Sequence, residues 1–586
     1  MPCGAENLAV PVGVMWSYLG GVTTPPAADL RSPDTVMRLA RLGSFHQSRL
    51  SFMRVLLRRL ATEGWRFERV RFDIEAPGVG VAVYEARGPE RTYSLVCFAH
   101  DLPADQRSDR VIAHAWDSTF ALVDGIADDA TIERLADNVP KQEAGRVSAG
   151  ELSLSRANRS VRLFEHVVDR LAAGEQPDPA KLDEVGYLMR TTAVYGSGKF
   201  GLADRERIAD RPELQGPFQA EMLSVFLIRA YTLDLVEHLA RLRSPHTAVV
   251  MDPDLRRSLG VGNATGLGMA PFVVNHPALF NNWITAKETA LARVRALPHA
   301  EPAAQRRFLE LLDRAQLNAA GWNSVHELQV EKVSELVADL AALAEVAPDL
   351  IAGVDPWDSL VRWSEAELGL EGQEQLVSLV LEPYGHLVDD LAATMGAEEA
   401  AAFAIDGSMA IDELSSIVSS VYAWALDVDW TSRHETARAW YVSEEKLEPR
   451  VGERHDEPIE PYESPLAPGR DAARLHADLV RWDGDPIVAA FLLAHPEHRF
   501  AVRRAQVAVD FPYSEIRDNT ISADVLPIDF LRCKLSYFGA THFDPRSDRW
   551  VRIIMFRHAP FPRELAGLPT DEVDDWGYPP LCREVS

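Results

Sequence analysis

The stretch FQAEMLSVFLIRAYTLDLVEHLA, residues 218–240, decides how the rest of this chain is organised. Apolar side chains occupy most of its helical circumference, whereas a surface helix carries a single apolar stripe. Such a helix is stable only when other elements enclose it, because water would otherwise contact its apolar faces. The sequence therefore predicts a central helix between Phe218 and Ala240, surrounded by other helices.

Two glycine-rich segments flank this helix. They are YGSGKFG at residues 195–201 and GVGNATGLG at residues 260–268, and the second continues through Asn275, His276 and Pro277 towards Asn281. We interpret both as loops, because glycine frees the backbone and lets its N–H groups approach a ligand. We expect the two loops to line one positively polarised hollow inside a helical body.

The first loop is not a P-loop of the nucleotide-binding kind. Ala193 stands where that motif needs glycine, and Phe200 stands where it needs Ser or Thr to bind Mg²⁺. Flexible Gly198 beside Lys199 still suits a carboxylate or phosphate. The alternative is a glycine-rich helix connection with a solvated lysine.

The second loop is a loose GxGxxxG pattern. A dinucleotide-binding fingerprint follows a strand, but the residues before Gly260 look helical and no repeated βαβ pattern comes after. Asn263, Thr265 and Gly266 are candidate substrate-binding residues, because the N-terminus of a following helix offers unpaired N–H groups to an anion. Close helix packing is the competing explanation for the glycines.

Three residues are the candidate catalytic groups: Tyr195, His276 and Glu515. An imidazole titrates near neutral pH and suits proton transfer, and Glu515 can be its partner from a distant part of the chain. The candidate substrate-binding residues are Arg190, Gly198, Lys199, Asn263, Thr265, Gly266, Asn275 and Arg532. Structural ion pairs and a capped helix bend are the alternatives for these polar residues.

The predicted fold class is mainly α, α+β overall. Alternating apolar residues between about 66 and 125 indicate a small antiparallel sheet near the N-terminus. Beyond about residue 130 the spacing is helical almost throughout, including the segment 431–447. We therefore expect a multi-helix body with one small sheet.

Composition shifts suggest four regions. They are an N-terminal α+β region at 1–130, a central helical domain at 131–448, a Pro-rich acidic loop at 449–470 and a C-terminal helical and mixed region at 471–586. A chain of 586 residues exceeds the size at which one core stops growing, so several structural units are expected.

The charge balance narrows the partners. Sixty basic and 88 acidic residues give a formal net charge of -28, which disfavours nucleic acid and anionic membrane surfaces. The apolar patch at Leu8–Val22 lacks a preceding basic residue, so we predict no secretory signal. We expect a soluble, cytoplasmic protein. A homo-oligomer is compatible with this expectation.

Metal and cofactor signals are weak. His495 and His498 have HxxH spacing, but Pro496 between them disturbs a helical register, so we predict no metal site. The four cysteines lie far apart and indicate no disulfide framework. The sequence identifies no cofactor.

The preferred functional hypothesis is a cytosolic enzyme that acts on a small anionic metabolite bearing a carboxylate or phosphate. Acid–base chemistry fits the candidate residues, as in a lyase, isomerase or decarboxylase. A flavin-type oxidoreductase in a helical scaffold is one alternative. A non-catalytic scaffold or assembly protein that presents grooves to partner helices is the other.

Overall fold

The computed structural model describes fifteen stretches of the chain. They are residues 30–101, 116–139, 150–191, 211–266, 277–322, 327–396, 406–431, 438–443, 448–453, 464–466, 468–517, 527–540, 542–547, 550–569 and 572–578. Most of the regular structure in these stretches is helical.

A nine-stranded sheet runs through the protein in the order β1-β2-β3-β4-β5-β6-β7-β12-β11. The strands are β1 (Arg66–Glu75), β2 (Val79–Arg87), β3 (Thr92–Ala99), β4 (Ser118–Asp124), β5 (Glu151–Arg159), β6 (Tyr187–Thr191), β7 (Gly260–Gly266), β11 (His542–Ser547) and β12 (Trp550–Met555). Neighbouring strands are antiparallel except for the parallel pair β6–β7. The expectation of a small N-terminal sheet in a helical body is therefore wrong.

The first four strands do form where the sequence alternates, between residues 66 and 124. The error lies in the strands that follow residue 130. Strand β6 has only five residues, four of them buried, so it offers little alternation to read. Strand β12 joins the same sheet from nearly 300 residues further along the chain, through pairing with β7.

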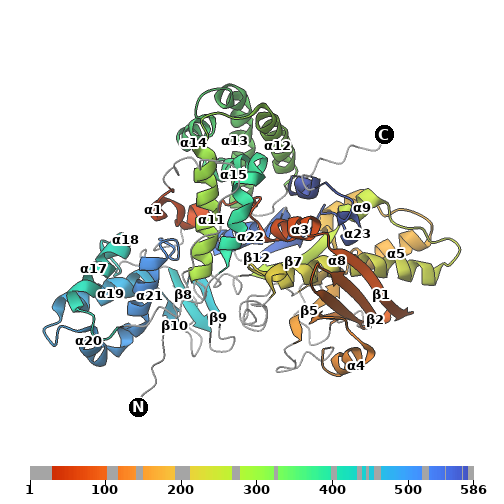
Figure 1. Ribbon diagram of the computed structural model, residues 1–586, viewed down its shortest axis with the longest axis horizontal. Coiled ribbons are helices and arrows are strands. Elements are labelled where there is room, and N and C mark those ends of the chain that lie inside the picture. Colours follow the sequence, from red (N-terminus) through yellow and green to blue (C-terminus); the bar gives the residue numbers. More distant parts are fainter. Residues whose placement is uncertain are drawn as a thin grey trace, which may run out of the picture.

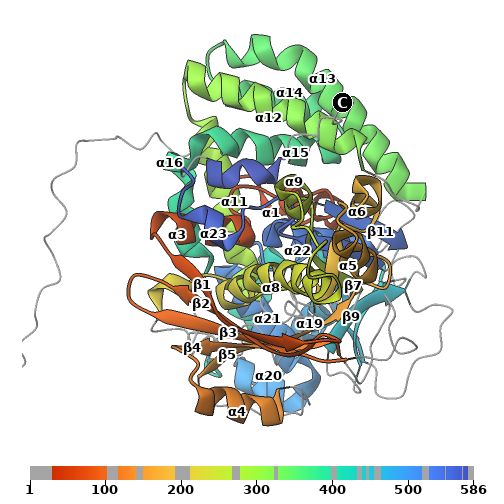
Figure 2. The same ribbon diagram turned by 90° about the vertical axis from the view of Figure 1, so that its right-hand side faces the viewer.

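The central helix predicted at 218–240 is confirmed as α8 (Gln219–Arg243). It connects the parallel strands β6 and β7 and contacts β2, β3, β5, β6 and β7. Figure 2 shows α8 lying along the inner side of the curled sheet. Strands together with helices enclose α8, whereas the sequence led us to expect helices alone.

Strand β7 occupies most of the segment that we predicted as the second glycine loop. Its glycines serve strand packing: a Cβ atom on Gly262 would lie 2.5 Å from the ring of Tyr187 on β6. A Cβ atom on Gly260 would lie 2.4 Å from the carbonyl oxygen of Met555 on β12. Only glycine permits such close approach of neighbouring backbones and rings. Residues 267 and 268 lie outside the described residues.

Shorter helices complete the sheet layer. They are α4 (Asp129–Asn138), α5 (Phe164–Ala172), α6 (Pro179–Val185), the 3-10 helix η3 (Pro212–Leu214) and α9 (Pro253–Arg257). Helix α4 covers the outer face of the sheet, where Ile132 and Leu135 pack with Val96 and Phe98 in a small separate core. The inner face packs on α8, so both faces of the central strands are buried.

A helical bundle forms the upper part of the molecule in Figure 1. It contains α11 (Pro277–Arg295), α12 (Pro302–Ala320), α13 (Glu327–Ile351), α14 (Pro356–Glu367), α15 (Leu370–Leu381), η5 (Glu382–Tyr384), α16 (Gly385–Val388) and η6 (Asp389–Met395). The two ends of the chain add α1 (Pro33–Val36), α2 (Leu39–Leu42), α3 (Phe52–Thr62), α22 (Pro527–Phe538), α23 (Pro562–Leu565) and η8 (Glu572–Gly577). One hydrophobic core runs through the sheet, the bundle and these terminal helices.

Buried carboxylates on and beside α15 hold these parts together. Glu374 accepts from Arg31 at 2.7 Å, from Arg41 at 2.8 Å and from Lys287 at 2.5 Å. Burial alone would raise the pKa of Glu374, but Arg31, Lys287 and Arg41 lower it well below its ordinary value. The carboxylate is therefore ionised, and it links the N-terminal segment to α11 and α15.

Two further carboxylates repeat this pattern. Glu382 receives both terminal nitrogens of Arg54 at 2.6 Å, and Glu371 receives both terminal nitrogens of Arg532 at 2.6 Å. Arg54 and Arg58 also contact Asp574 near the C-terminus. The bidentate geometry fixes the orientation of each guanidinium as well as its position.

A second unit lies apart from this core, at the lower left of Figure 1. Its helices are α17 (Ile411–Val421), α18 (Ala423–Leu426), α19 (Pro468–Arg481), α20 (Val488–Ala494), η7 (Pro496–His498) and α21 (Arg499–Asp510). They enclose a core of their own, which includes Leu414, Leu475, Phe491 and Val502.

A three-stranded sheet, β10-β8-β9, precedes α19 in this region. Its strands are β8 (Arg438–Ser443), β9 (Glu448–Glu453) and β10 (Ser464–Leu466). The helix predicted at 431–447 is therefore wrong over the residues of β8. In the predicted acidic loop at 449–470, residues 454–463 and 467 lie outside the described residues.

Among the described residues, no helix combines the length and the apolar character that crossing a bilayer requires.

The Glu374→Gln variant tests the role of the buried network. Glutamine leaves Arg41 and Lys287 without their buried ion-pair partner and leaves Arg31 with Glu288 alone, so we expect the free energy of unfolding to fall by about 3–5 kcal/mol. Urea denaturation followed by tryptophan fluorescence measures the change. Glu310→Gln is the control. The Glu310 carboxylate pairs with Arg307 and is 55% exposed, so loss of this ion pair lowers the free energy of unfolding by at most about 1 kcal/mol. Equal losses in both variants would contradict this account.

Asp574 makes stability depend on acid pH. Burial would raise the pKa of this carboxyl, but Arg58, Arg54 and Arg49 lower it to about 2. Its folded-state pKa is below the unfolded value, so its contribution is present above about pH 4 and is lost as pH falls towards about 2. In wild type this loss amounts to about 2 kcal/mol. The Asp574→Asn variant should show a shallower fall in unfolding free energy across that interval, and an unchanged slope would argue against the assignment.

Candidate functional site

A cleft of about 560 Å³ opens beside the β1–β2 hairpin. Its walls come from β1, β2, α8, residues 250–256 and the start of α23. Clefts between about 300 and 1,000 Å³ are the usual size for small-molecule sites. We call it the hairpin cleft and treat it as the candidate functional site.

One stripe of α8 leads into this cleft. Between residues 219 and 240 the helix is buried except for Ala230, Asp234 and His238, which are partly exposed. These positions are four residues apart and therefore share one helix face. Ala230 and Asp234 line the cleft, and His238 lies 2.7 Å from the carbonyl oxygen of Ile74 on β1. Between residues 219 and 240 the central helix is thus solvent-accessible only along the face that meets the hairpin.

The apolar part of the lining is formed by Phe67, Leu227, Met251 and Phe561. Phe561 is fixed from beneath by Arg229 of α8, whose guanidinium carbon lies 4.0 Å from the ring centroid. Arg229 is buried and donates to the carbonyl oxygens of Leu259 and Ala559 at 2.7 Å each. This arginine therefore clamps the α9 and α23 sides of the cleft to the central helix.

Tyr84, Asp234 and Arg69 form the polar part nearest the sheet. The Tyr84 hydroxyl donates to Asp234 Oδ2 at 2.8 Å, and Arg69 Nη1 lies 3.0 Å from the same oxygen. Burial raises the pKa of Tyr84, and the neighbouring Asp234 raises it further. Tyr84 therefore keeps its proton at neutral pH and acts as a hydrogen-bond donor.

Three arginines from separate segments also line the cleft: Arg69 of β1, Arg256 of α9 and Arg563 of α23. Arg256 contacts Glu237 at 3.2 Å through one nitrogen, which leaves other N–H donors of its guanidinium. The lining carboxylates are Glu68, Glu85, Asp234, Asp252 and Glu564. Together with the ion-pair partners Arg87, Arg257 and Glu237, this set has a local net charge of -1.

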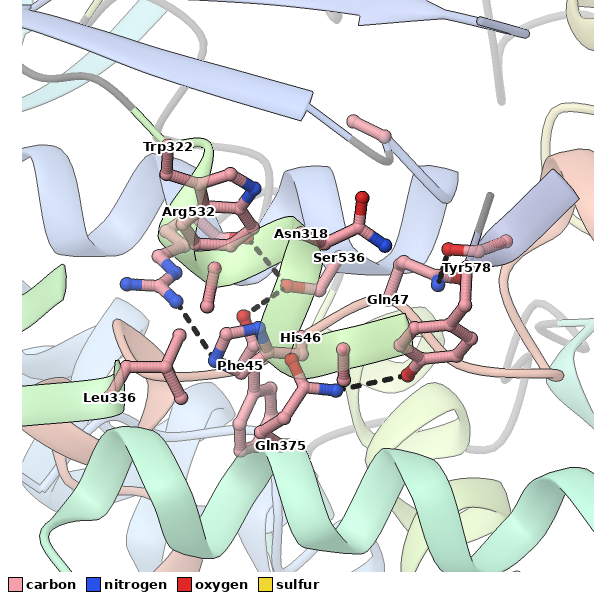
Figure 3. Close-up of a pocket in the computed structure, with 14 residues that line it drawn as sticks. Phe45, His46, Gln47, Asn318, Trp322, Leu336, Gln375, Arg532, Ser536 and Tyr578 are labelled. Atoms are coloured by element: carbon pink, nitrogen blue, oxygen red, sulfur yellow. Dashed lines mark hydrogen bonds between the residues drawn. The ribbon is translucent and has the colours of Figure 1, made fainter. Parts of the chain in front are cut away.

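A smaller cavity of about 40 Å³ lies between the bundle and the chain ends. Figure 3 shows Arg532, His46 and Trp322 grouped on one side of it and Gln47, Gln375 and Tyr578 on the other. A water molecule needs about 10–15 Å³ of such space. This cavity therefore accommodates a few water molecules, and it is too small for a metabolite.

His46 in this cavity lies between a guanidinium and a carboxylate. Burial lowers its pKa, and nearby Arg532 lowers it too, although Glu371 opposes both effects. Arg532 Nη2 lies 3.1 Å from His46 Nε2, and a guanidinium can only donate. Glu371 Oε2 lies 3.2 Å from the same nitrogen, so the tautomer of the ring decides which of these two groups is the hydrogen-bond partner of Nε2. The ring also stacks on Trp322 at a centroid distance of 5.8 Å.

The predicted site residues fall into separate places. Arg532 occupies the small cavity with Glu371 and His46. Glu515 accepts from Tyr422 at 3.2 Å and from Arg504 at 2.7 Å, at the border with the second unit. Neither residue is among those that line the hairpin cleft.

The other predicted residues cluster around the parallel strands or lie outside the described residues. Arg190 of β6 pairs in register with Gly262 of β7, so the segments near 190 and 262 are neighbours. Asn263, Thr265 and Gly266 pair through their backbones with β12. Tyr195, Gly198, Lys199, Asn275 and His276 lie outside the described residues. Whether the two predicted loops share one site therefore stays a prediction.

Sequence reasoning named Arg532 of the small cavity but none of the residues that line the hairpin cleft. His46 follows the short helix α2 with no motif around it, and Tyr84 belongs to a strand that reads as ordinary core. A usable signal was Asp234, one of three carboxylates inside a largely apolar helix. A charge at such a position must meet either a partner or solvent.

Comparisons with protein-family models, with curated proteins and with solved structures found no match for this chain.

A double-mutant cycle with Tyr84→Phe and Asp234→Asn tests the polar wall of the cleft. Tyr84→Phe removes the 2.8 Å hydrogen bond, and Asp234→Asn replaces its charged acceptor with a neutral one. Their effects on unfolding free energy should therefore be non-additive by about 1 kcal/mol. The matched cycle combines Tyr84→Phe with Glu310→Gln on α12 and should be additive. An additive Tyr84–Asp234 cycle would show that this bond does not form.

Proposed function

We propose that this protein binds a small organic acid in the hairpin cleft. The acid would have one carboxylate and an aromatic or branched apolar body. The observation that carries the proposal is a cleft of about 560 Å³ with an apolar surface and arginines from three separate segments. Burial of an apolar body supplies affinity, and the arginines orient the charged end.

The charge pattern favours a monocarboxylate over a phosphate. The cleft residues and their ion-pair partners have a net charge of -1, and the whole chain has -28. A doubly charged phosphate would meet this repulsion twice, whereas one carboxylate can be matched by one guanidinium. Arg563 is the best candidate, because it is exposed at the rim and no described carboxylate forms an ion pair with it.

Acid–base catalysis, as a lyase, isomerase or decarboxylase, stays a prediction. Its proposed groups Tyr195 and His276 lie outside the described residues, and Glu515 is engaged by Arg504 and Tyr422. In the hairpin cleft, Tyr84 donates a hydrogen bond to Asp234, and Asp234 forms an ion pair with Arg69. These features support binding and orientation of a ligand.

Isothermal titration calorimetry with three matched compounds tests the proposal. Phenylpropionate, phenylethyl phosphate and phenylpropylamine share an aromatic body and differ in the charge of the polar end. We expect phenylpropionate to bind most tightly. Tightest binding of the amine would overturn the proposed ligand class, and no binding of any compound would overturn the site.

Two variants locate the binding. Ala230→Phe places a ring in the cleft and should abolish binding. Arg563→Gln removes one charge-assisted contact and should weaken it roughly 10-fold. Arg362→Gln, a 73% exposed arginine of α14, is the matched control and should leave the affinity unchanged. Unchanged affinity in Ala230→Phe would place the ligand elsewhere.

A further inference from the structure

The second unit brings a carboxylate to the two histidines of the HxxH segment. Asp478 comes from α19, His495 ends α20, and His498 ends the 3-10 turn η7. One ligand atom from each of these side chains lies within 4.8 Å of the other two. The sequence shows only the two histidines as neighbours, and the fold adds the third group.

Pro496 explains why the two imidazoles face the same way. It begins the 3-10 turn, where proline is tolerated because its missing N–H is unneeded. Such a turn has three residues per turn, so side chains three positions apart lie one above the other. His495 is the N-cap of this turn, its carbonyl oxygen accepts from the His498 N–H at 3.2 Å, and the two ring centroids are 6.1 Å apart. The proline that argued against a metal site in an α-helix therefore favours one here.

We propose that Asp478, His495 and His498 form a binding site for a divalent transition-metal ion such as Zn²⁺. Two imidazoles and one carboxylate are a common ligand set for such ions. His498 Nε2 lies 2.9 Å from Asp478 Oδ2. Metal–ligand distances of about 2.0–2.1 Å place adjacent donors roughly 2.9–3.4 Å apart. These two atoms are therefore already spaced to share one ion, and His495 closes the site by a small side-chain rotation.

Neighbouring side chains support the two rings. His498 is buried and stacks on Phe491 at a centroid distance of 5.8 Å, and His495 contacts Trp482 edge-on at 5.8 Å. Glu497 Oε1 lies 3.3 Å from His495 Nδ1. A carboxylate in this position accepts the Nδ1 proton and leaves Nε2 for the metal, which makes Glu497 a positioning residue.

Solvent access and the local charges are compatible with the site. The side chains of Asp478 and His495 are 33% and 34% exposed, so an ion can enter and keep water in its remaining coordination positions. Arg481 lies 3.7 Å from the other Asp478 oxygen, but its side chain is 77% exposed and can move away. The ion would join α19 to α20 and η7 around the second core. This site shares no residue with the hairpin cleft.

Calorimetric titration of the chelator-treated full chain with ZnCl₂ tests this site. We expect wild type to bind about one Zn²⁺ ion more per chain than the Asp478→Asn and His495→Ala variants. Both substituted side chains are partly exposed, so these variants should fold. Glu497→Gln should keep the stoichiometry and weaken binding roughly 10–100-fold. His246→Ala, an exposed histidine outside the second unit, should bind as wild type does.

A second readout identifies the ligands. Co²⁺ in place of Zn²⁺ should give visible absorption bands in wild type and in His246→Ala, and His495→Ala should lose them. Equal Zn²⁺ stoichiometry and equal Co²⁺ spectra in wild type, Asp478→Asn and His495→Ala would overturn the proposal.

Discussion

Buried ion pairs around α15 are the constraint on which the rest of the structure depends. Glu371, Glu374 and Glu382 lie in or directly after an apolar helix, where an unpaired carboxylate would be costly to bury. Each is matched by arginines from the chain ends: Arg532, Arg31 with Arg41, and Arg54. Hydrophobic burial holds the core together but is non-directional. The bidentate pairs add direction, because they dock residues 31–58, the bundle and residues 532–574 in one arrangement.

The same arrangement decides where ligand space remains. Helix α8 follows β6 and precedes β7 in the chain, and the sheet together with α3 and α5 covers most of its surface. Its accessible stripe meets the β1–β2 hairpin, and α23 closes the opposite wall. Arg229 links these walls through backbone carbonyls, so the cleft is set by the core. The small His46 cavity has the opposite character, since its polar groups mostly bond one another.

Sequence reasoning succeeded where a pattern was local. The alternating strands up to residue 124 and the central helix follow directly from side-chain periodicity. It failed for β7, whose glycines look like a loop because their role depends on Tyr187 and Met555 in neighbouring strands. It also failed for β8, and it did not place β12 beside β7, because strand pairing between distant segments leaves no short-range signal. The site proposed at the HxxH segment likewise depends on the 3-10 turn and on Asp478 of α19, which a local sequence pattern does not bring together.

The sequence by itself determined that α8 must be enclosed, that the first four strands alternate, and that the chain has a strongly negative charge. These properties depend on the identity and spacing of nearby residues. Tertiary structure alone decided that strands of a nine-stranded sheet join helices in enclosing α8, that Asp234 meets Tyr84 and Arg69, and that Asp478 lies beside two histidines. These facts depend on distances between segments far apart in the chain. Such distances are set by the packing and ion pairing of the whole core.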